Sequence, residues 1–273
     1  MDGVYEKYRM LSDALQKTDG IAVAFSGGTD SSFLLYAAKE ALGEKILAVT
    51  AASPFVPKRE VQAAKAFCET YGIRHTVIPA SSLSIDPVRH NPPDRCYLCK
   101  RQIMGVVLEK AREQGFFTVA EGANADDGNE YRPGSRAVKE LGVLSPLKEV
   151  GLTKAEIRQL SLEMGLPTWD KPANACLATR FLTNDPITDE GLLAVEAAED
   201  LLHDKGFLQV RVRLHGDLIR IETPTNDLAR FIASDAPSAV CALLKQKGFR
   251  FITLDLEGYK TGNMDVLGKL EKL

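Results

Sequence analysis

Apolar and polar positions alternate along the first 150 residues in a regular succession of two patterns. Short runs rich in β-branched residues are typical of buried strands, and the stretches between them carry apolar residues at helical spacing. Such an alternation predicts an α/β fold, a doubly wound parallel sheet with its ligands at the carboxyl ends of the strands. The predicted strands are Gly20–Phe25, Lys45–Ala51, Arg74–Pro79, Phe116–Ala120 and Val143–Ser145, and the predicted helices are Ser31–Leu42, Pro57–Tyr71, Arg95–Gln114 and Leu152–Met164.

The pattern changes in the last third of the chain. Residues 165–185 carry few helix or strand signals and several prolines, and a stretch of that length is usually functional or a linker. We therefore expect a domain boundary near residue 185, between a nucleotide-binding domain (1–185) and a smaller α+β domain (186–273) for substrate binding or oligomerisation. The predicted αββαβ unit of the second domain consists of a helix Thr188–His203, a hairpin of Gln209–Leu214 and Leu218–Glu222, a helical stretch through Lys247 and a strand Phe249–Leu256.

The first predicted strand runs into the sequence Ser-Gly-Gly-Thr-Asp-Ser-Ser, which starts at Ser26 and leads directly into a helix. A helix N-terminus binds phosphate through its free N–H groups, and glycines let the backbone approach the anion. The loop lacks the lysine of GxxxxGK[ST] and does not fit GxGxxG. It resembles the SGGxDS loop of enzymes that split ATP into AMP and pyrophosphate; an ordinary Gly-rich turn is the alternative. The candidate ATP and pyrophosphate contacts are Ala24, Ser26, Gly27, Gly28, Asp30, Ser31 and Asp126.

Acidic residues follow another predicted strand, in the segment Glu-Gly-Ala-Asn-Ala-Asp-Asp that begins at Glu121. Carboxylates at this sheet edge can hold Mg²⁺ against a pyrophosphate, and Asp126, Asp127 and Asp30 are the candidates. Asp30 is also a candidate catalytic residue. The alternative is a solvated acidic loop that contains one helix cap.

Three of the five cysteines are placed for chemistry. Cys96 and Cys99 form a CxxC at the start of a predicted helix, and Cys176 lies in the long irregular stretch. A lone CxxC is compatible with a redox pair, half of a zinc site or part of an iron–sulfur site. Three thiolates suit a [4Fe–4S] cluster whose fourth iron is open. Cys68 and Cys241 lie on helical apolar faces and are expected in the core.

Bulk composition narrows the class of protein. The 273 residues carry a net charge of −3, and no apolar run approaches the roughly 20 residues needed to span a bilayer. We expect a cytoplasmic protein with a small-molecule substrate and without a nucleic-acid or membrane partner.

Four segments together resemble the LarE family of ATP-dependent sulfur transferases, which help to make the nickel-pincer nucleotide of lactate racemase. They are SGGTDSS, EGANADD, PANACLATR around Cys176, and VRVRLHGDLIRIE in the second half, in order along nearly the whole chain. The resemblance implies an ATP-pyrophosphatase fold, ATP and Mg²⁺, and adenylation of the carboxylates of a pyridinium-3,5-dicarboxylate mononucleotide. Sulfur then replaces each activated oxygen. It also implies a homo-oligomer; the sulfide donor is left open.

The family has a single-cysteine form, in which the cysteine matching Cys176 gives up its own sulfur, and a three-cysteine form with a [4Fe–4S] cluster. Cys96 and Cys99 place this chain with the second form, in which Cys176 is a cluster ligand. The family also shows an acidic divalent-metal site at the positions of Glu199 and Glu222, although by position alone each is expected to be a surface glutamate.

Arg211 and Arg213 alternate along one predicted strand and therefore face the same way. Two guanidinium groups on one face suit a phosphate, here the ribose phosphate of the substrate, and Arg180 is a further candidate for a phosphate or carboxylate contact. The alternative is a strand with a solvated basic face.

Two competing functions stay open from the sequence. A tRNA thiolase also combines SGGxDS with CxxC and one more cysteine, but it should carry a basic extension or zinc modules. A non-catalytic adenine-nucleotide-binding zinc protein would close a four-ligand metal site, with His90 as a conceivable fourth ligand.

Overall fold

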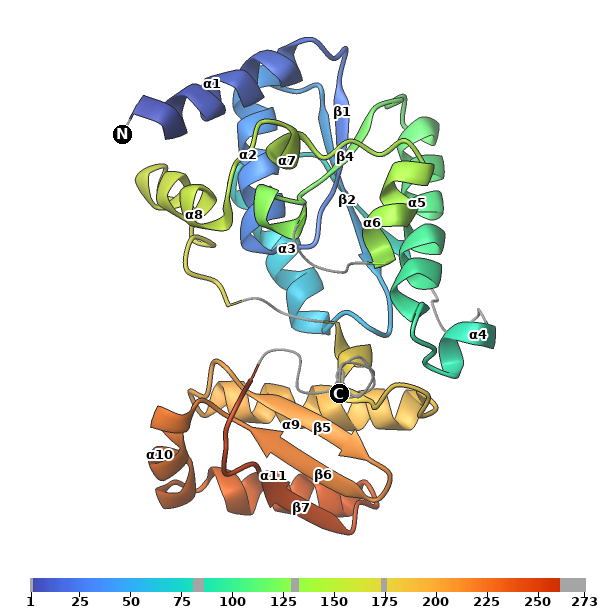
Figure 1. The fold of residues 1–273 in the computed structure, drawn as a ribbon, viewed down its shortest axis with the longest axis vertical. Helices are drawn as coiled ribbons and strands as arrows, with labels where there is room; N and C mark the ends of the chain where they lie inside the picture. The colour runs from blue at the N-terminus through green and yellow to red at the C-terminus, as the bar shows by residue number, and fades with distance from the viewer. Residues whose placement is uncertain (1, 81–85, 129–132, 173–175, 261–273) are drawn as a thin grey trace, which may run out of the picture. The chain divides into compact units, whose positions relative to one another are not determined.

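Four parallel strands form a sheet in the order β3-β2-β1-β4 (Figure 1). The computed structural model describes residues 2–80, 86–128, 133–172 and 176–260. Ile21 lies opposite Ile46 in the register of the two central strands, and Ala22 lies opposite Val119. The predicted parallel α/β sheet is confirmed, with strands β1 (Ile21–Ala24), β2 (Ile46–Ala52), β3 (His75–Pro79) and β4 (Val119–Glu121).

Helices cover both faces of this sheet, because its strands are apolar on both sides. Ile21 and Val23 pack with α1, α2, α3 and α8 on one face, and Ala22 packs with α5 and α6 on the other (Figure 1). No helix of the described residues is long and apolar enough to cross a membrane. The helices of this layer arrangement are α1 (Asp2–Gln16), α2 (Thr29–Leu42), α3 (Lys58–Thr70), α5 (Arg95–Glu113), α6 (Pro133–Glu140), α7 (Pro146–Glu149) and α8 (Lys154–Glu163).

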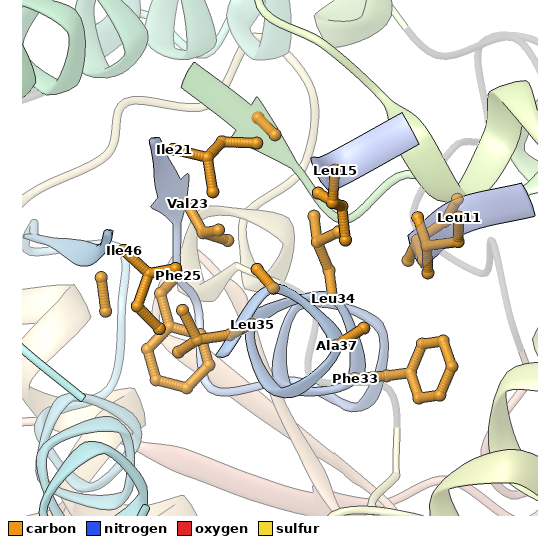
Figure 2. Close-up of a cluster of buried hydrophobic side chains, with 14 of the residues drawn as sticks. Leu11, Leu15, Ile21, Val23, Phe25, Phe33, Leu34, Leu35, Ala37 and Ile46 are labelled. Carbon is orange, nitrogen blue, oxygen red and sulfur yellow. The ribbon is translucent and has the colours of Figure 1, made fainter. Parts of the chain in front are cut away.

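The apolar core beside α2 fixes the direction in which this helix leaves β1. Figure 2 shows Val23 and Phe25 of the strand side next to Leu34 and Leu35 of the helix, and all four are at most 2% exposed. Burial of one such side chain stabilises the fold by roughly 1.5–3 kcal/mol. The strand–loop–helix connection is therefore held firmly at both ends.

The sequence prediction of a fifth strand at Val143–Ser145 is wrong. Leu144 forms only an isolated parallel bridge with Ala120. The segment stops there because Ser145 is the N-cap of α7 and Pro146 is its first residue. Proline lacks the N–H that a continuing strand would need.

The predicted capping box at the start of α8 is confirmed. The Thr153 hydroxyl accepts the Glu156 N–H, and the Glu156 carboxylate accepts the Thr153 N–H at 2.8 Å. These bonds satisfy two N–H groups that the helix geometry leaves open.

A second sheet, in the order β5-β6-β7, belongs to the predicted αββαβ unit. β5 and β6 are an antiparallel hairpin, and β7 adds parallel to β6. Gly216 takes φ +59° in the two-residue turn between β5 and β6, a conformation that favours glycine. The elements are η3 (Leu177–Arg180), α9 (Asp189–Asp204), β5 (Arg211–His215), β6 (Leu218–Glu222), α10 (Leu228–Ala233), α11 (Ala236–Gln246) and β7 (Phe251–Leu254).

The chain forms two units, one of residues 1–82 and 94–174 and one of residues 83–93 and 175–273. The short helix α4 (Asp86–Arg89) belongs to the second unit, although it precedes α5 in the sequence. The backbone N–H of Asn184 donates to the carbonyl of Asn91, and that of Ile187 donates to the carbonyl of Arg89. Residue 185, the expected boundary, therefore lies inside the second unit.

Candidate functional site

The loop from Ser26 to Gly28 leaves the N-terminus of α2 available to an anion. Gly28 is the N-cap, and no side chain of the described residues caps the helix there. Gly27 takes φ +72°, and the hydroxyl oxygens of Ser26 and Ser31 lie 3.0 Å apart. Free N–H groups, hydroxyl donors and the helix dipole all favour a phosphate at this point.

Gly122, just beyond β4, allows the closest backbone approach at this sheet edge. A Cβ atom on it would lie 2.8 Å from the Ser31 backbone nitrogen and 3.1 Å from the Asp30 carbonyl carbon. The sequence analysis did not single out this glycine, because the requirement arises from the β4 end crossing the start of α2.

The acidic candidates Asp30 and Asp126 meet at Lys154, the first residue of α8. The Lys154 ammonium lies 2.8 Å from Asp30 Oδ2, and its backbone N–H donates to Asp126 Oδ2 at 2.8 Å. The other Asp30 oxygen is buried and has no hydrogen-bond partner among the described residues. Asp127 instead accepts the Asn124 N–H within its own turn. Carboxylate oxygens of this kind fit Mg²⁺, with Asp30 and Asp126 as the holders.

Lys171 is a second lysine at the loop that the sequence analysis missed. Its ammonium donates to the Gly27 carbonyl at 2.8 Å and to Glu60 at 2.7 Å. The Thr29 hydroxyl donates to the Thr168 carbonyl at 2.8 Å. The segment 168–171 therefore fixes the phosphate loop from outside the strand–helix unit, a contact that no local sequence signal announces.

Two of the remaining candidates in the first unit have less specific surroundings. Ala24 ends β1 between Val49 and Glu121 of the neighbouring strands. Trp169, the single tryptophan of the chain, is 38% exposed and follows Thr168 directly. It therefore serves as a fluorescent reporter beside the loop.

Replacing Lys154 with Met tests the charge next to Asp30. We expect pyrophosphate release to slow by about 10²-fold, because the positive charge beside the developing leaving group is lost while the backbone bond to Asp126 remains. The measurement is steady-state pyrophosphate release, together with ATP titrations followed by Trp169 fluorescence. Lys148→Met, on the exposed side of α7, is the matched control. Wild-type rates in the Lys154 variant would contradict the assignment.

The three functional cysteines of the sequence analysis belong to different units. Cys96 and Cys99 lie in the first turn of α5 in the first unit, where the Arg95 guanidinium donates to Cys96 Sγ at 3.6 Å. Cys176 precedes η3 in the second unit. All five cysteines are free thiols, and Cys68 is buried, which raises its pKa to about 12. Among the residues that the structure describes, no group of three His, Cys, Asp or Glu is arranged to hold a metal ion; the three-cysteine cluster stays a prediction.

Cys176 is tied to the arginines of the second unit. Its carbonyl accepts the Arg180 Nη1 donor at 3.3 Å and the Thr179 hydroxyl at 2.8 Å. The Thr179 carbonyl accepts Nη1 of Arg213 at 3.0 Å. The PANACLATR segment and strand β5, which are distant in the sequence, therefore come together here.

Arg180 and Glu199 form a buried ion pair in which each side chain is 2% exposed. Both guanidinium–carboxylate bonds are present, at 2.8 and 2.9 Å, and the Val212 N–H also donates to Glu199. Burial alone would raise the pKa of Glu199, but the charge and hydrogen bonds of Arg180 outweigh it and hold this pKa below its ordinary value. Glu199 thus remains ionised inside the protein.

Arg211, Arg213 and Glu222 are buried as well. Glu222 Oε2 accepts both Nε and Nη2 of Arg213, and the Arg211 guanidinium lies 5.3 Å from the centre of the Tyr259 ring. Burial, followed by the charge of Arg180, lowers the pKa of Arg211. The alternative of a solvated basic strand face is wrong, and so is the surface position expected for Glu199 and Glu222. Both errors arise because β5 lies between α9 and η3.

Comparisons with known proteins agree with this geometry. The NAD synthase family model matches residues 4–89, which contain the phosphate loop. The pyridinium-3,5-bisthiocarboxylic acid mononucleotide synthase of Lactiplantibacillus plantarum is 35% identical over 97% of this chain and 96% of its own length. This chain belongs to the LarE family. An uncharacterized protein of Synechocystis sp. is 37% identical over 95% of the chain and 97% of its own length.

More distant relatives share the nucleotide-binding part of this LarE-family chain. A glutamine-hydrolyzing GMP synthase of Thermoplasma volcanium is 27% identical over 67% of the chain and 63% of its own length. Together with the parallel sheet, these matches identify the ATP-pyrophosphatase fold and an ATP-using enzyme.

Proposed function

We propose that this LarE-family enzyme transfers sulfur to the carboxylates of a pyridinium-3,5-dicarboxylate mononucleotide through acyl-adenylates, with release of AMP and pyrophosphate. The observation that carries the proposal is the direct hydrogen bonding of the Cys176 segment to the arginines of β5 and η3. That arrangement joins a sulfur-bearing residue to a cluster suited to a phosphate.

ATP activates the carboxylate because oxide is a poor leaving group. A carboxylate oxygen of the substrate attacks the α-phosphorus of ATP, and the bond to the β,γ-pyrophosphate breaks. A sulfur nucleophile then attacks the acyl carbon, and AMP leaves. Repetition at the second carboxylate completes the product.

The first unit stabilises the charge that develops on pyrophosphate. The uncapped start of α2, the hydroxyls of Ser26 and Ser31 and the ammonium of Lys154 supply the donors. Mg²⁺, held by Asp30 and Asp126, supplies further neutralisation when bound.

Cys96, Cys99 and Cys176 would hold a [4Fe–4S] cluster, whose open iron supplies exchangeable sulfide when the cluster is bound. Thiolates are the ligands that such clusters take in proteins. The donor set is soft and complete, and all three thiols are free. We further propose that the enzyme works in the cytoplasm as a homo-oligomer.

The test combines cluster and product analysis. After anaerobic purification, we expect about four iron atoms per chain and a broad band near roughly 400 nm, both lost in Cys96→Ala. ATP and substrate should yield AMP and pyrophosphate, with Cys176 intact by mass spectrometry after turnover. Formation of ADP would sink the adenylation step. Absence of iron together with dehydroalanine at Cys176 would assign the single-cysteine form instead.

A further inference from the structure

Arg220 faces the same side of the second sheet as the two arginines of β5. In the register of the hairpin, Arg213 lies directly opposite Arg220, and Arg211 lies opposite Glu222. Alternation along each strand therefore brings three guanidinium groups to one face. The sequence analysis named only Arg211 and Arg213.

Two like charges opposite each other destabilise a hairpin unless a counter-charge lies between them. Glu222 fills this role, since its Oε2 accepts Nη2 of Arg213 at 2.9 Å and its Oε1 accepts Nη2 of Arg220 at 2.9 Å. The carboxylate is 0% exposed. It thus divides its two oxygens between arginines of neighbouring strands.

The face keeps an excess of positive charge. Three guanidinium groups stand against two carboxylates, Glu222 and Asp255, the latter 3.6 Å from Arg220. The Arg180–Glu199 pair beside them is neutral as a whole. Excess positive charge in a buried setting is costly, and an anionic ligand would offset it.

Exposure separates the roles of the three arginines. The Arg213 side chain is 6% exposed, whereas that of Arg220 is 27% exposed. Arg220 is therefore the guanidinium that a ligand arriving from solvent meets first.

We propose that Arg220 is a third phosphate-binding arginine of this face, and that Glu222 is the positioning residue that holds Arg213 and Arg220 for a phosphomonoester dianion. The identity of this dianion as the ribose phosphate of the substrate rests on the proposed function. The phosphate site itself rests only on the geometry of the second unit.

The direct test is calorimetric titration with inorganic phosphate, in the presence of a saturating non-hydrolysable ATP analogue that fills the loop at α2. We expect Arg220→Gln to weaken phosphate binding at least tenfold. Arg250→Gln, at an exposed arginine of the same unit, is the matched control and should bind like wild type. Equal affinities in the wild type and Arg220→Gln would overturn the proposal.

Glu222→Gln tests the positioning role. Glutamine offers one acceptor oxygen in place of two, so it can hold Arg213 or Arg220 but not both. We expect a raised KM for the mononucleotide and an unchanged KM for ATP. If this buried substitution prevents folding, Arg220→Lys, which keeps the charge but not the planar fork, carries the test through the same split in KM.

A second pair of ligands separates this inference from the proposed function. Titration with a pyridinium carboxylate mononucleotide and with its nucleoside, which lacks the phosphate, should show an Arg220 effect on the first alone. Arg220-dependent binding of phosphate without binding of the mononucleotide would leave the site and refute the substrate. Mononucleotide binding that is unaffected by Arg220→Gln would do the reverse.

Discussion

Glu199→Gln should lower the free energy of unfolding by about 3–5 kcal/mol, the cost of leaving one partner of a buried pair without its counter-charge. Arg180 would lose both charged hydrogen bonds in a position that is 2% exposed. The measurement is chemical denaturation of wild type and variant at neutral pH. Glu190→Gln, on the exposed start of the same helix, is the control and should change stability by less than about 1 kcal/mol.

The pH dependence of this difference has a definite sign. The pKa of Glu199 is lowered in the folded protein, against about 4.3 for an unfolded chain. Its stabilisation is therefore fully present above that value and is lost as the pH falls through the folded pKa. The gap between wild type and Glu199→Gln should be constant from about pH 5 to 8 and narrow in stronger acid. A gap that widens on acidification would contradict the ionised pair.

Gly122→Ala should slow ATP-dependent turnover by about 10²-fold, the effect expected from misplacing reacting groups by about 1 Å. The new Cβ would lie 2.8 Å from the nitrogen and 2.9 Å from the Cα of Ser31. Because these are backbone atoms, the start of α2 must move. We also expect a loss of about 1–3 kcal/mol of stability from the overpacking.

Gly105→Ala is the matched control for this substitution. A Cβ at this position in α5 meets no heavy atom within 4 Å outside the backbone of its own helix. We expect full activity and a gain of about 0.5–1 kcal/mol, since alanine favours a helix over glycine. Pyrophosphate release and Trp169 fluorescence titrations measure both variants. Wild-type kinetics in Gly122→Ala would show that the approach of β4 to α2 does not position the loop.

The candidate site was predictable wherever its signal is local. The loop from Ser26 to Ser31 combines strand, glycines and helix start within a few residues, and its structure follows the prediction. Lys154 and Lys171 escaped notice because a single lysine carries no pattern. Their partners Asp30 and Glu60 lie more than one hundred residues away in the chain.

Burial of the arginines was also beyond a local pattern. Alternation places Arg211 and Arg213 on one face but does not say whether that face meets solvent. Here the Thr179 carbonyl and Glu222 enclose Arg213, so the charges are buried and paired.

The sequence by itself determined the parallel α/β sheet, the helix caps, the phosphate loop and the hairpin of the second unit, because hydrophobic period and turn residues act over short distances. Only the tertiary structure decided which charges are buried, which glycine must stay small and which lysines reach the loop. These properties depend on contacts between segments distant in the chain, and the free energy of a charge depends on the groups that surround it after folding.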